Sequence, residues 1–195
     1  MPLEPHRKPT QRIAAITALL CLSAAAFAQE HPSPLIAPVP ESLRVYGEMP
    51  PLPGVADLKF REFFKMPIGP RGLEPSDKLL QLDGQSVRLV GFMARQDDAI
   101  PGLFILSPLP VHMGDEDDSF SDDLPASAVF VRLSAEKQST RLPYMPGLLA
   151  LIGTLKIGAE EEPDGRVSVV RLLLSDPQSR ALAEAVPISY AATAR

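Results

Sequence analysis

The sequence predicts a mainly β domain preceded by a proline-rich N-terminal arm. Between residues 86 and 174, apolar residues alternate with polar ones or form short runs, as strands require. Turn dipeptides such as Asp83-Gly84 and Pro101-Gly102 separate these stretches. Proline makes up 22 of the 195 residues. A mainly helical bundle is therefore excluded, because proline inside a helix breaks it.

The first 28 residues have the three parts of a secretory signal peptide. A basic front is followed by the apolar run 13–27 and by an A-x-A cleavage motif that ends at Ala28. We expect a cleaved signal peptide over residues 1–28 and a periplasmic or secreted protein. An uncleaved anchor is the alternative, but a membrane span needs ~20 apolar residues. Membrane contact is thus expected only through the signal peptide, and lipidation of Cys21 is not expected because Cys21 lies inside the apolar run.

The mature chain, residues 29–195, is acidic and contains no cysteine. It holds 16 Lys and Arg against 23 Asp and Glu, which gives a net charge of −7. The lack of cysteine excludes disulfides, thiolate metal sites and cysteine nucleophiles. The negative charge argues against non-specific binding of nucleic acid, which depends on Lys and Arg.

The mature chain is expected to have three parts. Residues 29–54 contain seven prolines and predict an extended arm, either a linker or a segment laid over the domain. Residues 55–176 are expected to form the β-barrel domain, in which residues 55–66 form a short amphipathic helix or an extended lid. Residues 177–195 predict a short C-terminal helix over 180–186 and a tail.

Five strands are expected in the domain, over residues 86–95, 103–106, 126–133, 148–157 and 166–174. Gly91 and Gly153 lie inside two of them, and a glycine inside a strand marks a bend or a close approach of another backbone. These features are typical of a five-stranded OB-like barrel, a small Greek-key barrel, here with short helical additions. An open β-sandwich is the alternative. Residues 160–165 are predicted to form a hairpin loop.

The long connection between the second and third strands contains an acidic cluster. Six carboxylates fall within residues 115–123, directly after His112 and Met113. Carboxylate oxygens suit hard cations, so one hypothesis is a divalent-cation site. A calcium loop is incomplete here, because Phe120 stands where the sharp turn needs glycine. The simpler interpretation is a solvated, self-repelling loop. The candidate metal ligands are His112, Asp115, Asp117, Asp118, Asp122 and Asp123.

The segment Leu82–Met93 reads L-D-G-x-x-V-x-x-x-G-F-M and resembles the core of a bacterial family of secreted domains of unknown function. Residues 104–108, 129–132 and 153–155 are similar to the family's later elements, in the same order. The resemblance covers about residues 76–175, and it implies an OB-like barrel that acts beside a transport system and handles a solute or metal. The family's loop of Cys, His and prolines is replaced by acidic residues here, so no site residue carries over.

No catalytic motif accompanies these features. The sequence lacks a G-x-S-x-G elbow, a Walker A motif and a G-x-G-x-x-G loop. We therefore expect no enzyme and no cofactor, but a non-enzymatic binding or accessory module for an envelope protein partner, for example a component of a transport system. Two alternatives remain: binding of a solute or divalent cation through residues 112–123, and a hydrolase with His112 as its base.

Overall fold

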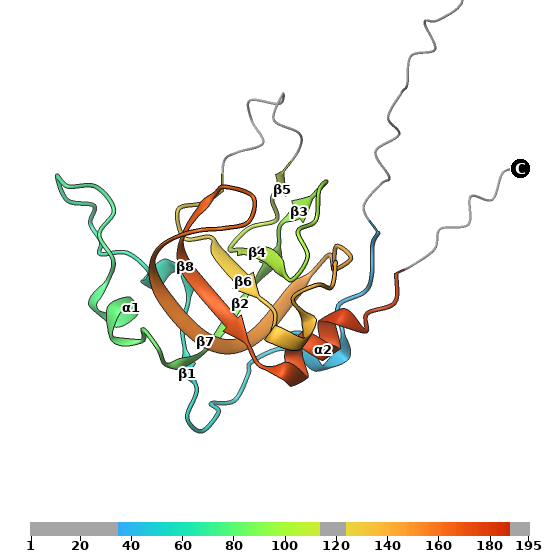
Figure 1. Cartoon of the computed structure of the whole chain (residues 1–195). Helices are drawn as coiled ribbons and strands as arrows, with labels where there is room; N and C mark the ends of the chain where they lie inside the picture. The colour runs from blue at the N-terminus through green and yellow to red at the C-terminus, as the bar shows by residue number, and fades with distance from the viewer. Residues whose placement is uncertain (1–34, 114–123, 188–195) are drawn as a thin grey trace, which may run out of the picture. The chain divides into compact units, whose positions relative to one another are not determined.

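The computed structural model describes residues 35–113 and 124–187 (Figure 1). The chain divides into two units, Met1–Pro32 and Ser33–Arg195, and every described residue belongs to the second. The predicted signal peptide, the carboxylates of 115–123 and the tail from residue 188 lie outside the described residues. Among the helices of the described ranges, none is long and apolar enough to cross a membrane.

Strands make up most of the regular structure. The strands are β1 (Ala56–Asp57), β2 (Ser86–Met93), β3 (Arg95–Gln96), β4 (Leu103–Ser107), β5 (His112–Met113), β6 (Val129–Arg132), β7 (Leu148–Glu161) and β8 (Val167–Leu174). The helices are α1 (Asp77–Gln81) and α2 (Asp176–Ala183), with short 3-10 turns η1 (Glu41–Leu43), η2 (Phe60–Glu62) and η3 (Ala135–Lys137). The prediction of a mainly β fold with short helical additions is confirmed.

Six strands form one mixed sheet, in the order β1-β2-β4-β6-β8-β7. β2 pairs with β7 as well, over seven residue pairs from Ser86 to Phe92. The pairings of β1 with β2 and of β6 with β8 are parallel, and the others in this sheet are antiparallel. β3 and β5 form a separate parallel pair. All five predicted strand regions are therefore strands of one sheet (Figure 1).

Several predicted boundaries are wrong. β2 ends at Met93 instead of residue 95, because Arg95 pairs with β5 in the second sheet. Residues 160 and 161 belong to β7 rather than to a hairpin loop. The C-terminal helix covers Asp176–Ala183 instead of 180–186, since Pro177 starts it in its first turn. The predicted helix or lid over residues 55–66 is instead β1 followed by η2.

The main hydrophobic core lies on one face of the sheet. Alternate residues of β2 point into it, including Val87 and Leu89, as the period of two requires. β4 is buried at all five positions because both of its faces are covered. Its outward residues Leu103 and Ile105 pack with Met113 of β5 and Phe130 of β6 in a second cluster. The β3–β5 pair thus belongs to a layer that covers the outer face of β4 and β6.

Two strand glycines mark places where another backbone comes close. A Cβ on Gly153 would lie 2.5 Å from the carbonyl oxygen of Leu173 in β8. A Cβ on Gly91 would lie 2.7 Å from the carbonyl oxygen of Ser107 and 2.8 Å from the ring of Phe60. All three contacts are shorter than real Cβ atoms make, so only glycine fits at these two positions.

The described part of the proline-rich arm packs on the domain. Ile36 forms a parallel bridge with Tyr144, and Arg44 bridges Leu149 of β7. Ala37 and Leu43 are buried in the main core. Of the two interpretations of the arm, the segment laid over the domain is correct for residues 35–44.

A buried arginine holds β1 against β2. Arg88 is 6% exposed, and its Nε and Nη2 donate to Asp57 Oδ1 (2.6 Å) and Oδ2 (2.9 Å). These hydrogen bonds from Arg88 lower the pKa of Asp57 below its ordinary value. A carboxyl whose pKa is lower in the folded state stabilises the fold above its unfolded pKa of about 3.9, and this stabilisation disappears as the pH falls through the folded value.

We therefore expect Asp57→Asn to lower Tm at pH 7 by about 2–4 °C, equivalent to about 1 kcal/mol. The difference from the unchanged protein should shrink below about pH 4, because Asp57 loses its charge there. Thermal unfolding followed by circular dichroism from pH 2 to 8 measures both effects. Asp98→Asn, at an exposed position, is the control. An equal loss in the two variants at pH 7 would contradict the role of the Arg88 pair.

Candidate functional site

A cleft of about 720 Å³ opens where three distant parts of the chain meet. The start of β4, the end of β6 with the residues that follow it, and the turn between β7 and β8 form its walls. Its lining combines prolines and an aliphatic side chain with charged and amide groups. The lining residues are Pro101, Gly102, Leu103, Arg132, Gln138, Glu161, Glu162 and Pro163.

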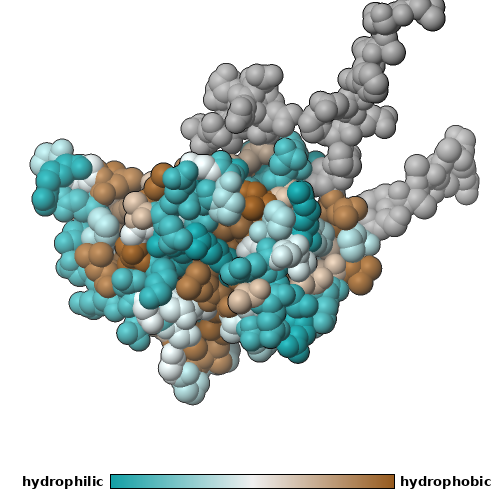
Figure 2. All heavy atoms as spheres, viewed as in Figure 1, coloured by the Kyte–Doolittle hydropathy of each residue, from teal (hydrophilic) through white to brown (hydrophobic). Residues whose placement is uncertain are grey.

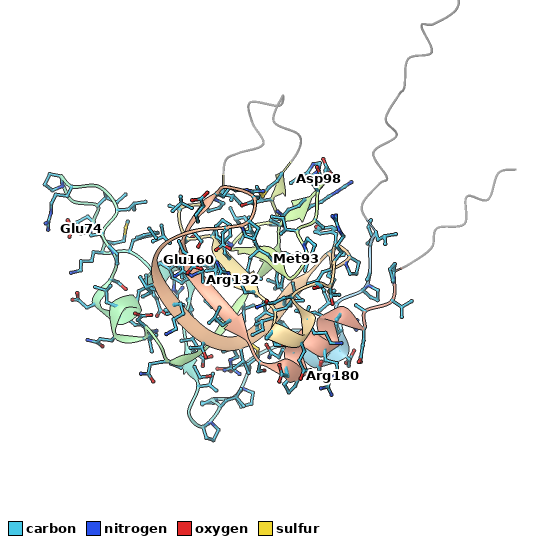
Figure 3. The ribbon with its side chains drawn as sticks, viewed as in Figure 1. Glu74, Met93, Asp98, Arg132, Glu160 and Arg180 are labelled. Carbon is cyan, nitrogen blue, oxygen red and sulfur yellow. The ribbon has the colours of Figure 1, made fainter. Side chains whose placement is uncertain are left out.

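Arg132 is the central cation of this cleft. It donates from Nη2 to Glu162 Oε2 (2.8 Å), and its Nη1 lies 2.7 Å from Glu160 Oε1. Arg132 and Glu160 lie together at the end of β6 and β7 (Figure 3). Burial lowers the pKa of Arg132, but the hydrogen bonds to Glu162 and Glu160 outweigh burial and raise the pKa overall. The hydrogen bond from Arg132 also lowers the pKa of Glu160. Arg132 and Glu160 are therefore both charged at neutral pH.

A second arginine, Arg171, forms hydrogen bonds that hold the end of β7 against β8. Arg171 is 7% exposed, and its Nη1 donates to the carbonyl oxygen of Gly158 (2.7 Å) and to Ser168 Oγ (3.0 Å). Its Nε lies 3.2 Å from Glu160 Oε2. The register between the two strands shifts between Ile157 and Glu160, at this same place. Arg171 therefore stabilises the irregular backbone that carries the glutamates to the cleft.

The glutamates give the cleft an excess of negative charge. Among the described residues, the cleft lining holds two carboxylates, Glu161 and Glu162, and one cation, Arg132, which gives it one formal net negative charge. The side chain of Glu162 is fully buried, and its Oε1 accepts no hydrogen bond from the described residues. Glu161 is exposed and forms no ion pair within the described ranges. Such a cleft can accept a hydrogen-bond donor or a cation better than an anion.

The predicted metal site is described only in part. His112 lies in β5, is exposed, and has its Nε2 3.2 Å from Asp97 Oδ1, a partner that the sequence did not suggest. Within residues 35–113 and 124–187, no three His, Cys, Asp or Glu side chains gather as metal ligands. The other candidate ligands, Asp115, Asp117, Asp118, Asp122 and Asp123, lie outside the described residues.

The start of the acidic loop and the cleft turn are in contact. Arg166, in the turn between β7 and β8, donates from Nη1 to Met113 Sδ (3.4 Å) and has its Nε 2.8 Å from Asp164 Oδ2. Met113 is the last described residue before the acidic segment. The end of β5 therefore lies beside the turn between β7 and β8.

The cleft residues were not predicted from the sequence. The run Glu160-Glu161-Glu162 before Pro163 is the pattern of a solvated turn, and Arg132 ends an ordinary strand. The ion pair joins positions 30 residues apart. No local sequence pattern predicts this ion pair, because it forms only when the strands are arranged in the sheet.

Comparison with protein-family models, with curated proteins and with solved structures found no match to this chain. The resemblance of Leu82–Met93 to secreted domains stays a prediction. A functional proposal has to start from the geometry of the cleft.

Proposed function

We propose that the chain is a non-enzymatic, periplasmic or secreted accessory module that binds a basic segment of a protein partner in the acidic cleft. The observation that carries the proposal is the cleft itself, in which two glutamates outnumber one arginine beside apolar walls. A lysine or arginine side chain of the partner fits this lining. Its aliphatic stem packs against Pro101 and Pro163, and its charged end meets Glu161.

An OB-like barrel is part of the proposal. The pairings lead from β2 through β4, β6, β8 and β7 back to β2, with β6 and β8 parallel. Five strands in this order support a small Greek-key barrel. Such barrels bind ligands on the second and third strands, between the loops after the first and fourth strands. Here those strands are β4 and β6, and the loops supply residues 101–102 and 162–163 to the cleft.

The layer formed by β3 and β5 is a second reason to place ligand binding at the cleft. In the second cluster, Met113 packs with Leu103 and Phe130 over the outer face of β4 and β6. A ligand is therefore directed to the end of this face, where Arg132 and Gln138 line the cleft. The net charge of −7 on the mature chain favours the same partner, because it attracts basic segments over a distance.

Binding of a basic peptide tests this proposal. Fluorescein-labelled hexalysine is titrated with residues 29–195 in low salt, with hexaglutamate as the negative probe. We expect hexalysine to bind, and Glu161→Lys to weaken it at least fivefold, because the variant reverses a charge on the cleft. Glu48→Lys makes the same charge change at an exposed position elsewhere and should stay within twofold. Equal weakening by the two variants would show general charge attraction and overturn the proposal.

Divalent-cation binding is the second candidate function. The observation that favours it is the contact between His112 Nε2 and Asp97 Oδ1 at the start of the acidic loop. Thermal unfolding with Ca²⁺, Zn²⁺ or Cu²⁺ tests it. A rise in Tm that disappears in His112→Ala would support a site that includes this histidine. An unchanged Tm at millimolar concentrations of all three ions would exclude it.

A further inference from the structure

Residues 65–73 form a projecting arm, called the apolar arm below. Its two sides are joined by a hydrogen bond from the amide of Lys65 to the carbonyl oxygen of Glu74 (2.9 Å). At its tip, the amide of Gly72 donates to the carbonyl oxygen of Gly69 (3.0 Å). All nine residues are exposed. The arm extends from the body of the domain beyond α1 (Figure 1).

The arm presents large apolar side chains to solvent. Met66 is 72% exposed, Ile68 is 57% exposed and Leu73 is 46% exposed. Leu80 of the neighbouring helix α1 is 51% exposed. Apolar spheres accompany polar ones on this projection (Figure 2). Several apolar side chains gathered on one exposed projection mark an interaction site, because single exposed apolar residues are normally scattered.

The arm has the opposite charge to the rest of the chain. Residues 65–73 contain two cations, Lys65 and Arg71, and no acidic residue. Their ion-pair partners stand at the base: Lys65 Nζ lies 2.8 Å from Asp77 Oδ1, and Arg71 Nε lies 2.9 Å from Glu74 Oε1. The wider segment 59–80 holds five Lys and Arg against three acids, within a mature chain of net charge −7. The projecting end is thus both apolar and basic.

The arm is firmly attached to the core. Phe63, just before it, is fully buried, and its ring centroid lies 5.4 Å from that of Phe60 and 6.5 Å from that of Phe64. Phe64 also forms a bridge with Pro75 on the other side of the arm. A projection held in this way loses little conformational entropy when it binds.

We propose that the apolar arm docks the domain on an anionic membrane surface. Met66, Ile68 and Leu73 enter the interfacial layer, while Lys65 and Arg71 meet the lipid phosphates. A lipid layer can deform around a convex arm. An acidic protein, the alternative partner, would need a pocket that matches the shape of the arm. The docking surface shares no residue with the cleft lining, and it departs from the expectation that only the signal peptide contacts a membrane.

Co-sedimentation with lipid vesicles tests the proposal. Residues 29–195 are mixed with vesicles that contain 30% phosphatidylglycerol in phosphatidylcholine, and with vesicles of phosphatidylcholine alone. We expect binding to the anionic vesicles that weakens as salt rises, and much weaker binding to the neutral ones. Met66→Ser with Ile68→Ser should lower the partition coefficient at least tenfold, without a change in Tm, because both side chains are exposed.

The control pair is Leu35→Ser with Leu109→Ser, at positions that are 65% and 64% exposed and lie outside the arm. It should change the partition coefficient by less than twofold. Equal losses in the two double variants, or equal binding to both kinds of vesicle, would overturn the proposal. If the unchanged protein does not bind the anionic vesicles, the membrane proposal is wrong and the arm serves a protein partner. Hexalysine binding at the cleft is unaffected by each of these outcomes.

Discussion

Replacing Arg132 by alanine is expected to destabilise the domain by about 3–5 kcal/mol, because the charge of Glu162 stays buried without its cation. Glu162 is fully buried as a side chain, and Arg132 supplies both of its charged hydrogen bonds. Chemical unfolding in urea at pH 7 measures the loss. Arg180→Ala removes an exposed arginine of α2 and should change the free energy of unfolding by at most about 0.5 kcal/mol.

A double variant distinguishes the cost of the unpaired buried charge from the cost of lost side-chain packing. Arg132→Met with Glu162→Leu removes both charges, keeps most of the volume, and should recover a large part of the stability lost in Arg132→Ala. Glu160 then keeps its contact with Arg171. If the double variant is as unstable as the single one, the loss comes from packing and the buried charge of Glu162 is not its cause.

Gly153→Ala is the second change with a large expected effect. The new methyl group would lie 2.5 Å from the carbonyl oxygen of Leu173 and 3.0 Å from the side chain of Leu172. β7 and β8 must then move apart, at a cost of about 1–3 kcal/mol. Gly69→Ala is the matched control, because nothing lies within 4 Å of its added Cβ and its φ is not in the left-handed range. Urea unfolding of both variants checks the prediction, and a stable Gly153→Ala would contradict the close approach.

The sheet could be predicted from the sequence because its signals are local. Alternation of Val87 and Leu89 with polar positions is enough to place β2, and Gly91 and Gly153 do mark close approaches. The cleft could not be predicted in this way. Glu162 looks like a turn residue until β6 pairs with β8 and brings Arg132 over it. The same holds for the contact between His112 and Asp97, which arises only when β3 and β5 pair.

The apolar arm shows a different limit of prediction from the sequence. Residues 55–66 are rich in apolar side chains, and Phe63 among them is buried. Met66 is 72% exposed, although its sequence neighbourhood is equally apolar. Pro67, Gly69 and Pro70 direct the chain away from the core before it returns at Pro75. Composition alone does not distinguish a buried methionine from one at the start of a projection.

The pairing of β2 with β7 decides when a newly made chain can fold. Val87 lies opposite Gly153, and Ile36 bridges Tyr144, so the early segments find their partners only after most of the chain has left the ribosome. Until then the sheet is incomplete, and long-range pairings of this kind form slowly. A chain that stays unfolded until its last strands are made is also one that a narrow export channel can still accept. This order of the strands is compatible with the secretion that the first 28 residues predict.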